Sequence, residues 1–173
     1  LMRPAMHYRP LGSLGVEVSE ISLGCNRLGE KGQPLAHWTA VVRRALDLGV
    51  NLFDTAESYG HEGGSERVLG EVIGNRESVV IATKIGGNPQ FKGHPGRQYS
   101  AAWIIDRAEQ CLRRLRRERI DVLQLHSPSL EALQASDWPQ AFDRLKQQGK
   151  LRWSGMAIES ADAGRWLIEN KLA

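Results

Sequence analysis

The sequence of 173 residues is poor in cysteine and contains no long apolar run. Its two cysteines, Cys25 and Cys111, lie far apart and have neither a Cys-x-x-Cys nor a metal-binding spacing, so we expect no structural disulfide. No segment reaches the ~20 apolar residues that a membrane span needs. Residues 1–10 also lack the apolar core of a signal peptide. We therefore expect a cytoplasmic location and no membrane partner.

Several motifs of catalytic and cofactor chemistry are missing as well. There is no G-x-G-x-x-G, and although Gly24 and Gly29 have the spacing of a P-loop, Glu30 and Lys31 follow where Lys and Ser or Thr are required. The sequence has no H-E-x-x-H pair, and its scattered histidines predict no metal site. A G-x-S-x-G hydrolase motif is absent too.

The charges are nearly balanced, with 23 Lys and Arg against 20 Asp and Glu. Five arginines nevertheless fall between residues 113 and 119, interleaved with Leu112, Leu115 and Ile120. This spacing is typical of the solvated face of an amphipathic helix. We therefore expect no nucleic-acid partner, despite a pI near 9.1.

Short apolar runs alternate with helical patterns from about residue 20 onward, which is typical of βαβ units around a parallel sheet. The predicted strands are 21–24, 51–54, 79–84, 121–126 and 151–157. The predicted helices are 37–48, one from about Ser65, 100–117, 140–148 and one from about Ala161.

A β-hairpin is predicted before these units, where residues 8–11 and 16–18 flank a glycine-containing turn. A TIM barrel has eight βα units and about 250 residues. The sequence therefore predicts an α/β fold with about five of the eight βα units of a TIM-type barrel, or an open sheet. We treat 1–173 as a single domain, with the hairpin in 7–19 and the βα units in 20–173.

Three predicted strands end in a titratable residue, namely Asp54, Lys84 and His126, and Tyr59 follows Asp54 in the next loop. The carboxyl ends of parallel strands meet at one rim, so we expect these side chains to converge. A lysine ammonium ~4 Å from a tyrosine hydroxyl would strengthen that weak acid by about 4 kcal/mol. A histidine can orient a carbonyl group, so the set suits carbonyl protonation. The alternative chemistry is a Schiff base on Lys84. We expect the loop 86–98 beside this rim to be mobile and to shape substrate choice.

The residues around these strand ends resemble the aldo-keto reductase family. Residues 51–60, continued by 64–70, are similar to the first signature of the family. Residues 81–84 are similar to its lysine strand, and 121–126 to its histidine strand. The start of the chain is similar to the bacterial and potassium-channel-β-like branches, and the resemblance covers essentially all of 7–160.

This resemblance implies reduction of an aldehyde or ketone, a small carbonyl substrate, by hydride transfer from NADPH. It makes Tyr59 the proton donor, assisted by Lys84. It makes Asp54 the partner of Lys84, and His126 the group that orients the carbonyl. The residues that it places at the nicotinamide end of NADP(H) are Gly24, Cys25, Asn26 and Asp54.

Two departures from the family pattern affect the expected activity. The family usually ends its fifth strand with Gly-Val-Ser-Asn, whose Ser and Asn side chains hold the nicotinamide carboxamide. Here the sequence reads Gly155-Met156-Ala157-Ile158. Family strands six to eight, which carry most of the cofactor site, have no counterpart. We therefore expect the short chain alone to be an impaired or inactive reductase. The alternative is a non-catalytic truncated relative that acts as a binding or assembly module.

Five strands of a barrel wall would leave two open edges, near Leu23 and near Trp153. We expect the side chains of Phe53, Ile81 and Leu123 to face the barrel interior and to meet no opposite wall. Burying such side chains stabilises a protein by ~1.5–3 kcal/mol each. This favours either a homo-oligomer formed through the open sheet edges or a sheet that flattens into an open form.

Overall fold

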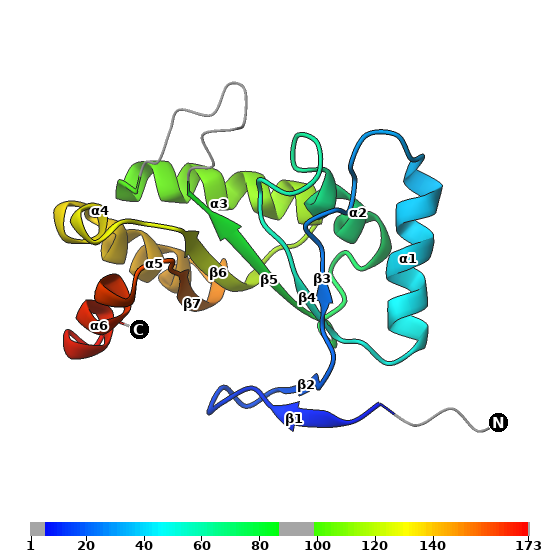
Figure 1. The fold of residues 1–173 in the computed structure, drawn as a ribbon, viewed down its shortest axis with the longest axis horizontal. Coiled ribbons are helices and arrows are strands. Elements are labelled where there is room, and N and C mark those ends of the chain that lie inside the picture. Colours follow the sequence, from blue (N-terminus) through cyan, green and yellow to red (C-terminus); the bar gives the residue numbers. More distant parts are fainter. Residues whose placement is uncertain (1–5, 87–98, 173) are drawn as a thin grey trace.

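The computed structural model describes residues 6–86 and 99–172, and a parallel five-stranded sheet lies at its centre (Figure 1). The strands lie in chain order: β3 (Leu23–Gly24), β4 (Leu52–Asp54), β5 (Val80–Ile85), β6 (Ile120–His126) and β7 (Leu151–Ala157). All four neighbouring pairs are parallel, which confirms the predicted five βα units. β3 is shorter than predicted, and within the described residues β3 and β7 are the edge strands.

The predicted hairpin consists of β1 (Tyr8–Pro10) and β2 (Glu17–Ser19), paired antiparallel. It lies at the amino end of β3 (Figure 1). Asn51, just before β4, ties it to the sheet: its Oδ1 accepts from the Ser19 N–H at 2.6 Å, and its own N–H donates to Ser19 Oγ at 3.1 Å. These bonds satisfy polar groups at the base of the sheet.

The helices are α1 (Leu35–Asp47), α2 (Gly64–Val72), α3 (Ala101–Leu115), α4 (Leu130–Ala135), α5 (Trp138–Gln147) and α6 (Ala161–Glu169). Helix α4 was not predicted, although Ser129 caps it by accepting a hydrogen bond from the Ala132 N–H. α1 packs on α2, α2 on α3, and α3 on α5. In the described part of the chain, no helix is both long and apolar enough to cross a membrane.

The face of the sheet beneath the helices carries its bulky apolar side chains. The Thr83 hydroxyl donates to Glu66 of α2 at 2.6 Å, so the side of β5 that bears Thr83 faces the helices. Ile81 lies on the same side of β5. The register pairs Phe53 with Ile81 and places Leu123 beside Thr83. The prediction that Phe53, Ile81 and Leu123 face an empty interior is therefore wrong, because all three are at most 1% exposed. A strand that is apolar throughout does not show which of its alternating side chains face the helices.

The opposite face of the sheet is more polar and only partly buried. On this face the register places residues of neighbouring strands next to each other in three rows across the sheet. From the amino end of the strands to the carboxyl end, the rows are Asp54, Ala82, Val122 and Trp153; Lys84, Gln124 and Gly155; and His126 and Ala157. All of these except Lys84 are intermediate in exposure. Three of the predicted site residues therefore lie on one face, toward the carboxyl ends of neighbouring strands.

The arginine-rich segment 113–119 is not a uniformly solvated face. Its exposed members are Arg113, Arg116 and Arg119. Arg114 instead reaches α2, where its Nε donates to Glu66 Oε2 at 2.6 Å. Arg117 is 8% exposed, pairs with Asp121 and donates to three backbone carbonyls between α2 and β5. The prediction was wrong for these two arginines, because spacing along a helix does not reveal partners on other elements.

Candidate active site

Lys84 and Asp54 form an ion pair at the carboxyl ends of β5 and β4. The distance from Lys84 Nζ to Asp54 Oδ1 is 2.7 Å, and Nζ also donates to the Thr55 carbonyl at 2.9 Å. The Lys84 side chain is 9% exposed and that of Asp54 is 44% exposed, so solvent screens the pair mainly from the Asp54 side. These contacts hold Lys84 as a hydrogen-bond donor in one orientation. They favour that role over a Schiff base, which needs a free amine.

Tyr59 lies between Lys84 and His126. Lys84 Nζ is 5.0 Å from the centroid of the Tyr59 ring. The rings of Tyr59 and His126 meet edge to face, with centroids 5.9 Å apart and an interplanar angle of 83°. The structure therefore brings all four predicted catalytic side chains together, although they come from three strands and a loop.

His126 is the member of the group whose protonation is most clearly perturbed. Burial lowers its pKa, and the nearby Lys84 ammonium lowers it further, whereas the carboxylates of Glu159 and Asp54 act in the opposite direction. The imidazole is therefore neutral at neutral pH, with one N–H to donate to a carbonyl oxygen. Tyr99, which lies two residues before α3, holds the backbone of His126 in place, because its hydroxyl donates to the His126 carbonyl at 2.7 Å.

Glu57 positions the loop that carries Tyr59, a role that was not predicted. It is 5% exposed, and its Oε1 accepts from the Gly86 N–H at 3.3 Å. Its Oε2 accepts from Arg107 Nε of α3 at 2.7 Å. The carboxylate thus joins the loop after β4 to the end of β5 and to a helix. The sequence signal was only an acidic residue in the loop that follows the predicted strand 51–54.

The residues predicted to hold a cofactor divide into exposed and buried members. Gly24 and Asn26 are exposed, and the register places Gly24 beside Asp54. Cys25 is fully buried, its N–H donates to the Asp54 carbonyl, and its own carbonyl accepts from the Ser65 hydroxyl. Burial, reinforced by the Asp54 carboxylate, raises the pKa of the Cys25 thiol to about 12. Cys25 therefore holds the loop in place, and Gly24, Asn26 and Asp54 are the members that can contact a cofactor.

This arrangement of four side chains at the rim of a parallel sheet agrees with comparisons to known proteins. The profile of the Aldo/keto reductase family matches residues 20–171. The chain belongs to the aldo/keto reductase family. Its fold is accordingly the TIM-barrel type, represented here by five parallel strands.

Individual relatives come from both branches that the sequence resembles. The uncharacterized oxidoreductase YqkF of Bacillus subtilis is 35% identical over 156 residues, which cover 88% of this chain and 49% of that protein. A putative voltage-gated potassium channel subunit beta of Schizosaccharomyces pombe is 34% identical, with 89% of this chain and 47% of that protein covered. The holo structure of the aldo-keto reductase AKR11C1 from Bacillus halodurans superposes with a TM-score of 0.83 at 30% identity, over 95% of this chain and 54% of that one. The chain thus spans about half the length of the curated relatives it matches.

The end of β7 departs from the pattern expected of an aldo/keto reductase. Ala157 lies beside His126 in the register and offers no side-chain hydrogen bond. Ile158 is 38% exposed, and its Cδ1 lies against Gly164 of α6, where an added Cβ would come within 2.6 Å. The predicted substrate loop 86–98 lies outside the described residues, apart from Gly86.

We expect two substitutions to move the pKa of His126 in opposite directions. Lys84→Met should raise it, because the ammonium that disfavours the imidazolium is removed. Asp54→Asn should lower it further, because a carboxylate that stabilises the imidazolium is removed. NMR titration of the His126 ring protons, assigned with a His126→Gln variant, measures both shifts.

Lys31→Met serves as the control for this titration, because Lys31 is exposed on the loop before α1 and its loss removes the same charge. It should leave the His126 titration unchanged. Equal titration of His126 in the wild type and in Lys84→Met would show that the two groups do not interact as the structure indicates.

Proposed function

We propose that this chain carries the catalytic centre of an oxidoreductase that reduces an aldehyde or ketone with NADPH. The observation that supports this proposal most strongly is the convergence of Lys84, Asp54, Tyr59 and His126 at one rim. It combines a proton donor, a cation beside it and a neutral imidazole.

The residues at the rim leave room for a nicotinamide cofactor. An added Cβ on Gly24 would meet no atom of the described residues within 4 Å, so none of them fills the space above the end of β3. Gly24 and Asp54 lie side by side there, and Asn26 is exposed in the following loop. The cofactor would supply a hydride to the carbonyl carbon. The choice of NADPH over NADH rests on the family resemblance.

Each of the four side chains has a definite task in this reduction. Tyr59 transfers the proton of its hydroxyl to the carbonyl oxygen, which gains negative charge as the carbon is reduced. Lys84 stabilises the resulting phenolate by its positive charge, while Asp54 keeps Lys84 oriented. His126 donates its ring N–H to the same carbonyl oxygen and thereby fixes the direction of the substrate.

The second candidate function is a non-catalytic binding or assembly module. The observation that favours it is the apolar pair Ala157 and Ile158, which cannot hold a nicotinamide carboxamide by side-chain hydrogen bonds. In this alternative the four rim side chains are retained from an enzyme ancestor but catalyse no reaction. Cofactor affinity separates the two functions.

Titration of the chain with NADPH, followed by cofactor fluorescence, tests the proposal. We expect binding in the micromolar range, and weaker binding of NADH. Gly24→Leu should weaken NADPH binding by about tenfold or more, because the side chain fills the open space at the rim. Its backbone needs no positive φ, so urea unfolding should match that of the wild type. No binding of NADPH at millimolar concentration would favour the module instead.

We also propose that two copies of the 173-residue chain associate through the sheet. Within the described residues β3 and β7 have no strand on their outer sides, and the face bearing Ala82, Val122 and Trp153 is only partly buried. Pairing of edge strands between copies would satisfy the backbone groups of these edges. Light scattering should give about twice the chain mass of 19.3 kDa. A mass of 19.3 kDa that stays constant as the protein is concentrated would contradict association.

A further inference from the structure

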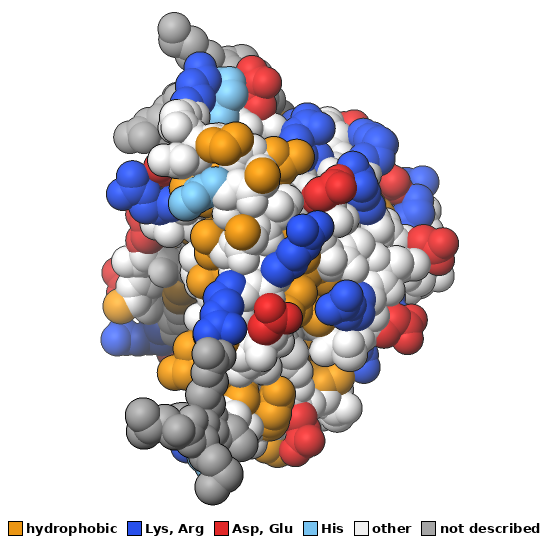
Figure 2. All heavy atoms as spheres, turned by 90° about the vertical axis from the view of Figure 1, so that its right-hand side faces the viewer, with side chains coloured by type: hydrophobic (Ala, Val, Ile, Leu, Met, Phe, Trp, Pro, Cys, Tyr) orange, Lys and Arg blue, Asp and Glu red, His pale blue; other side chains and the backbone are white. Residues whose placement is uncertain are grey.

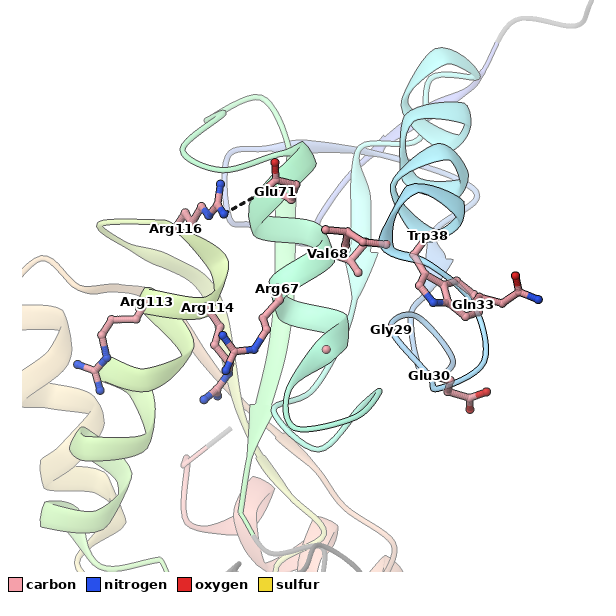
Figure 3. Close-up of a pocket in the computed structure, with 12 residues that line it drawn as sticks. Gly29, Glu30, Gln33, Trp38, Arg67, Val68, Glu71, Arg113, Arg114 and Arg116 are labelled. Carbon is pink, nitrogen blue, oxygen red and sulfur yellow. Dashed lines mark ion pairs between the residues drawn. The ribbon is translucent and has the colours of Figure 1, made fainter.

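A groove of about 400 Å³ crosses the outer surface of α2, between α1 and α3 (Figure 3). Its walls come from the loop after β3, the first turns of α1, the exposed side of α2 and the last turns of α3. Its lining includes none of the four rim side chains. The volume lies within the range of small-molecule sites, so the groove could hold a ligand independently of the proposed reductase centre.

Four arginines line this groove, and two of them have carboxylate partners. Arg114 Nε lies 2.6 Å from Glu66 Oε2. Arg116 forms an ion pair with Glu71 at 2.7 Å, drawn as the dashed line in Figure 3. These two arginines are therefore neutralised by neighbours on α2.

The other two arginines, Arg67 and Arg113, have no carboxylate partner among the described residues. In the described part of the chain, the Arg67 guanidinium has only a long contact of 3.5 Å from its Nε to the Glu62 carbonyl. The remaining carboxylate on the groove, Glu30, pairs with Arg27 at 3.0 Å. The groove therefore holds two exposed positive charges that nothing in the described structure balances.

The end of the groove formed by α1 carries apolar side chains, beside the polar Gln33 and Glu30. Leu35 is 55% exposed there, Trp38 is partly buried, and Val68 of α2 forms the floor. Figure 3 shows Trp38 and Val68 on the side away from Arg113, and Figure 2 shows apolar side chains among Lys and Arg on the face that carries α1. Gly29 and Gly64 pack backbone against backbone beside them, since a Cβ on Gly64 would lie 2.8 Å from the Gly29 carbonyl oxygen. One end of the groove thus suits an apolar body and the other suits an anion.

We propose that this groove binds a small phosphate monoester with an apolar or aromatic body. A phosphate monoester carries close to two negative charges at neutral pH, which matches the two unbalanced arginines. Guanidinium groups bind phosphate oxygens with paired hydrogen bonds, and the exposed Leu35 and partly buried Trp38 favour an aromatic body over a bare ion. The proposal does not depend on the reductase function.

Calorimetric titration with phenyl phosphate, in the absence of nucleotide, tests the site. We expect phenyl phosphate to bind more tightly than inorganic phosphate, which lacks the apolar body, and than benzoate, which carries a single charge. The double variant Arg67→Gln/Arg113→Gln should weaken phenyl phosphate binding by about tenfold or more. Leu35→Asn should weaken phenyl phosphate binding and leave inorganic phosphate binding unchanged.

The matched control is Arg43→Gln/Arg44→Gln, which removes two exposed arginines of α1 that do not line the groove. This control should bind phenyl phosphate as the wild type does. Equal weakening by both double variants would show that only net charge matters, and would overturn the proposal. Absence of phenyl phosphate binding at millimolar concentration would overturn it too, as would equal affinity for benzoate or for inorganic phosphate.

Discussion

Replacing Tyr59 with phenylalanine is expected to lower the rate of carbonyl reduction by about 10²- to 10⁴-fold, the usual contribution of a positioned general acid. The substitution removes only the hydroxyl, which is the proposed proton source, and keeps the ring that lies beside Lys84 and His126. The ring keeps its edge-to-face contact with His126, so the local packing should survive. The affinity for NADPH should change little, because the proposed partner of the hydroxyl is the carbonyl substrate. Oxidation of NADPH at saturating aldehyde, followed at high protein concentration, measures the effect.

Tyr8→Phe is the matched control, because Tyr8 is 46% exposed in the hairpin and its hydroxyl donates to the Gly49 carbonyl, away from the rim. This variant should reduce the aldehyde at the rate of the unmodified chain. If Tyr59→Phe kept more than a tenth of that rate, Tyr59 would not be the proton donor.

Replacing Arg117 with methionine is expected to cost about 3–5 kcal/mol of unfolding free energy, since it breaks a buried charge pair from one side. Arg117 donates to the carbonyls of Gly74, Arg76 and Val79 at 2.8–2.9 Å and pairs with Asp121. Asp121 Oδ2 in turn accepts from the Ile81 N–H of β5 at 2.9 Å. The variant leaves the carboxylate and the carbonyls buried without their cation. Urea unfolding should show a lower midpoint with an unchanged slope.

Two further variants separate this charge network from general effects of losing an arginine. Arg119→Met removes an exposed arginine of the same segment and should change the unfolding free energy by less than about 0.5 kcal/mol. Arg117→Met/Asp121→Leu removes both buried charges and should recover part of the lost stability. A loss below about 1 kcal/mol for Arg117→Met alone would contradict the structural role of the pair.

The strand order and the grouping of the four rim side chains could be predicted because both follow from local signals. Each buried strand is a short apolar run, and in parallel sheets the residues that close such runs share one edge. Asp54, Lys84 and His126 each close a run, so their convergence required no knowledge of packing. Tyr59 could be assigned to the same group because it lies in a loop only five positions after Asp54.

The orientation of side chains and the buried charge partners could not be predicted in the same way. Ile81 lies in a strand that is apolar over most of its length, so the sequence there does not distinguish the helix side from the open side. Arg114 and Arg117 look like surface residues of a helix, yet their partners lie on α2, on β6 and in the loop before β5. Such contacts join residues up to 48 positions apart, and no local pattern encodes them. Glu57 was missed for the same reason.

Transfer of deuterium tests most directly whether these side chains form a reductase centre. The chain is incubated with an aromatic aldehyde and NADPH that carries deuterium on both faces of C4 of the nicotinamide. The alcohol is then analysed by mass spectrometry. We predict that the wild-type chain forms alcohol deuterated at the former carbonyl carbon, and that Tyr59→Phe forms it at least about 100-fold more slowly. Absence of deuterated alcohol with the wild-type chain, or equal amounts with both proteins, would contradict the proposed function.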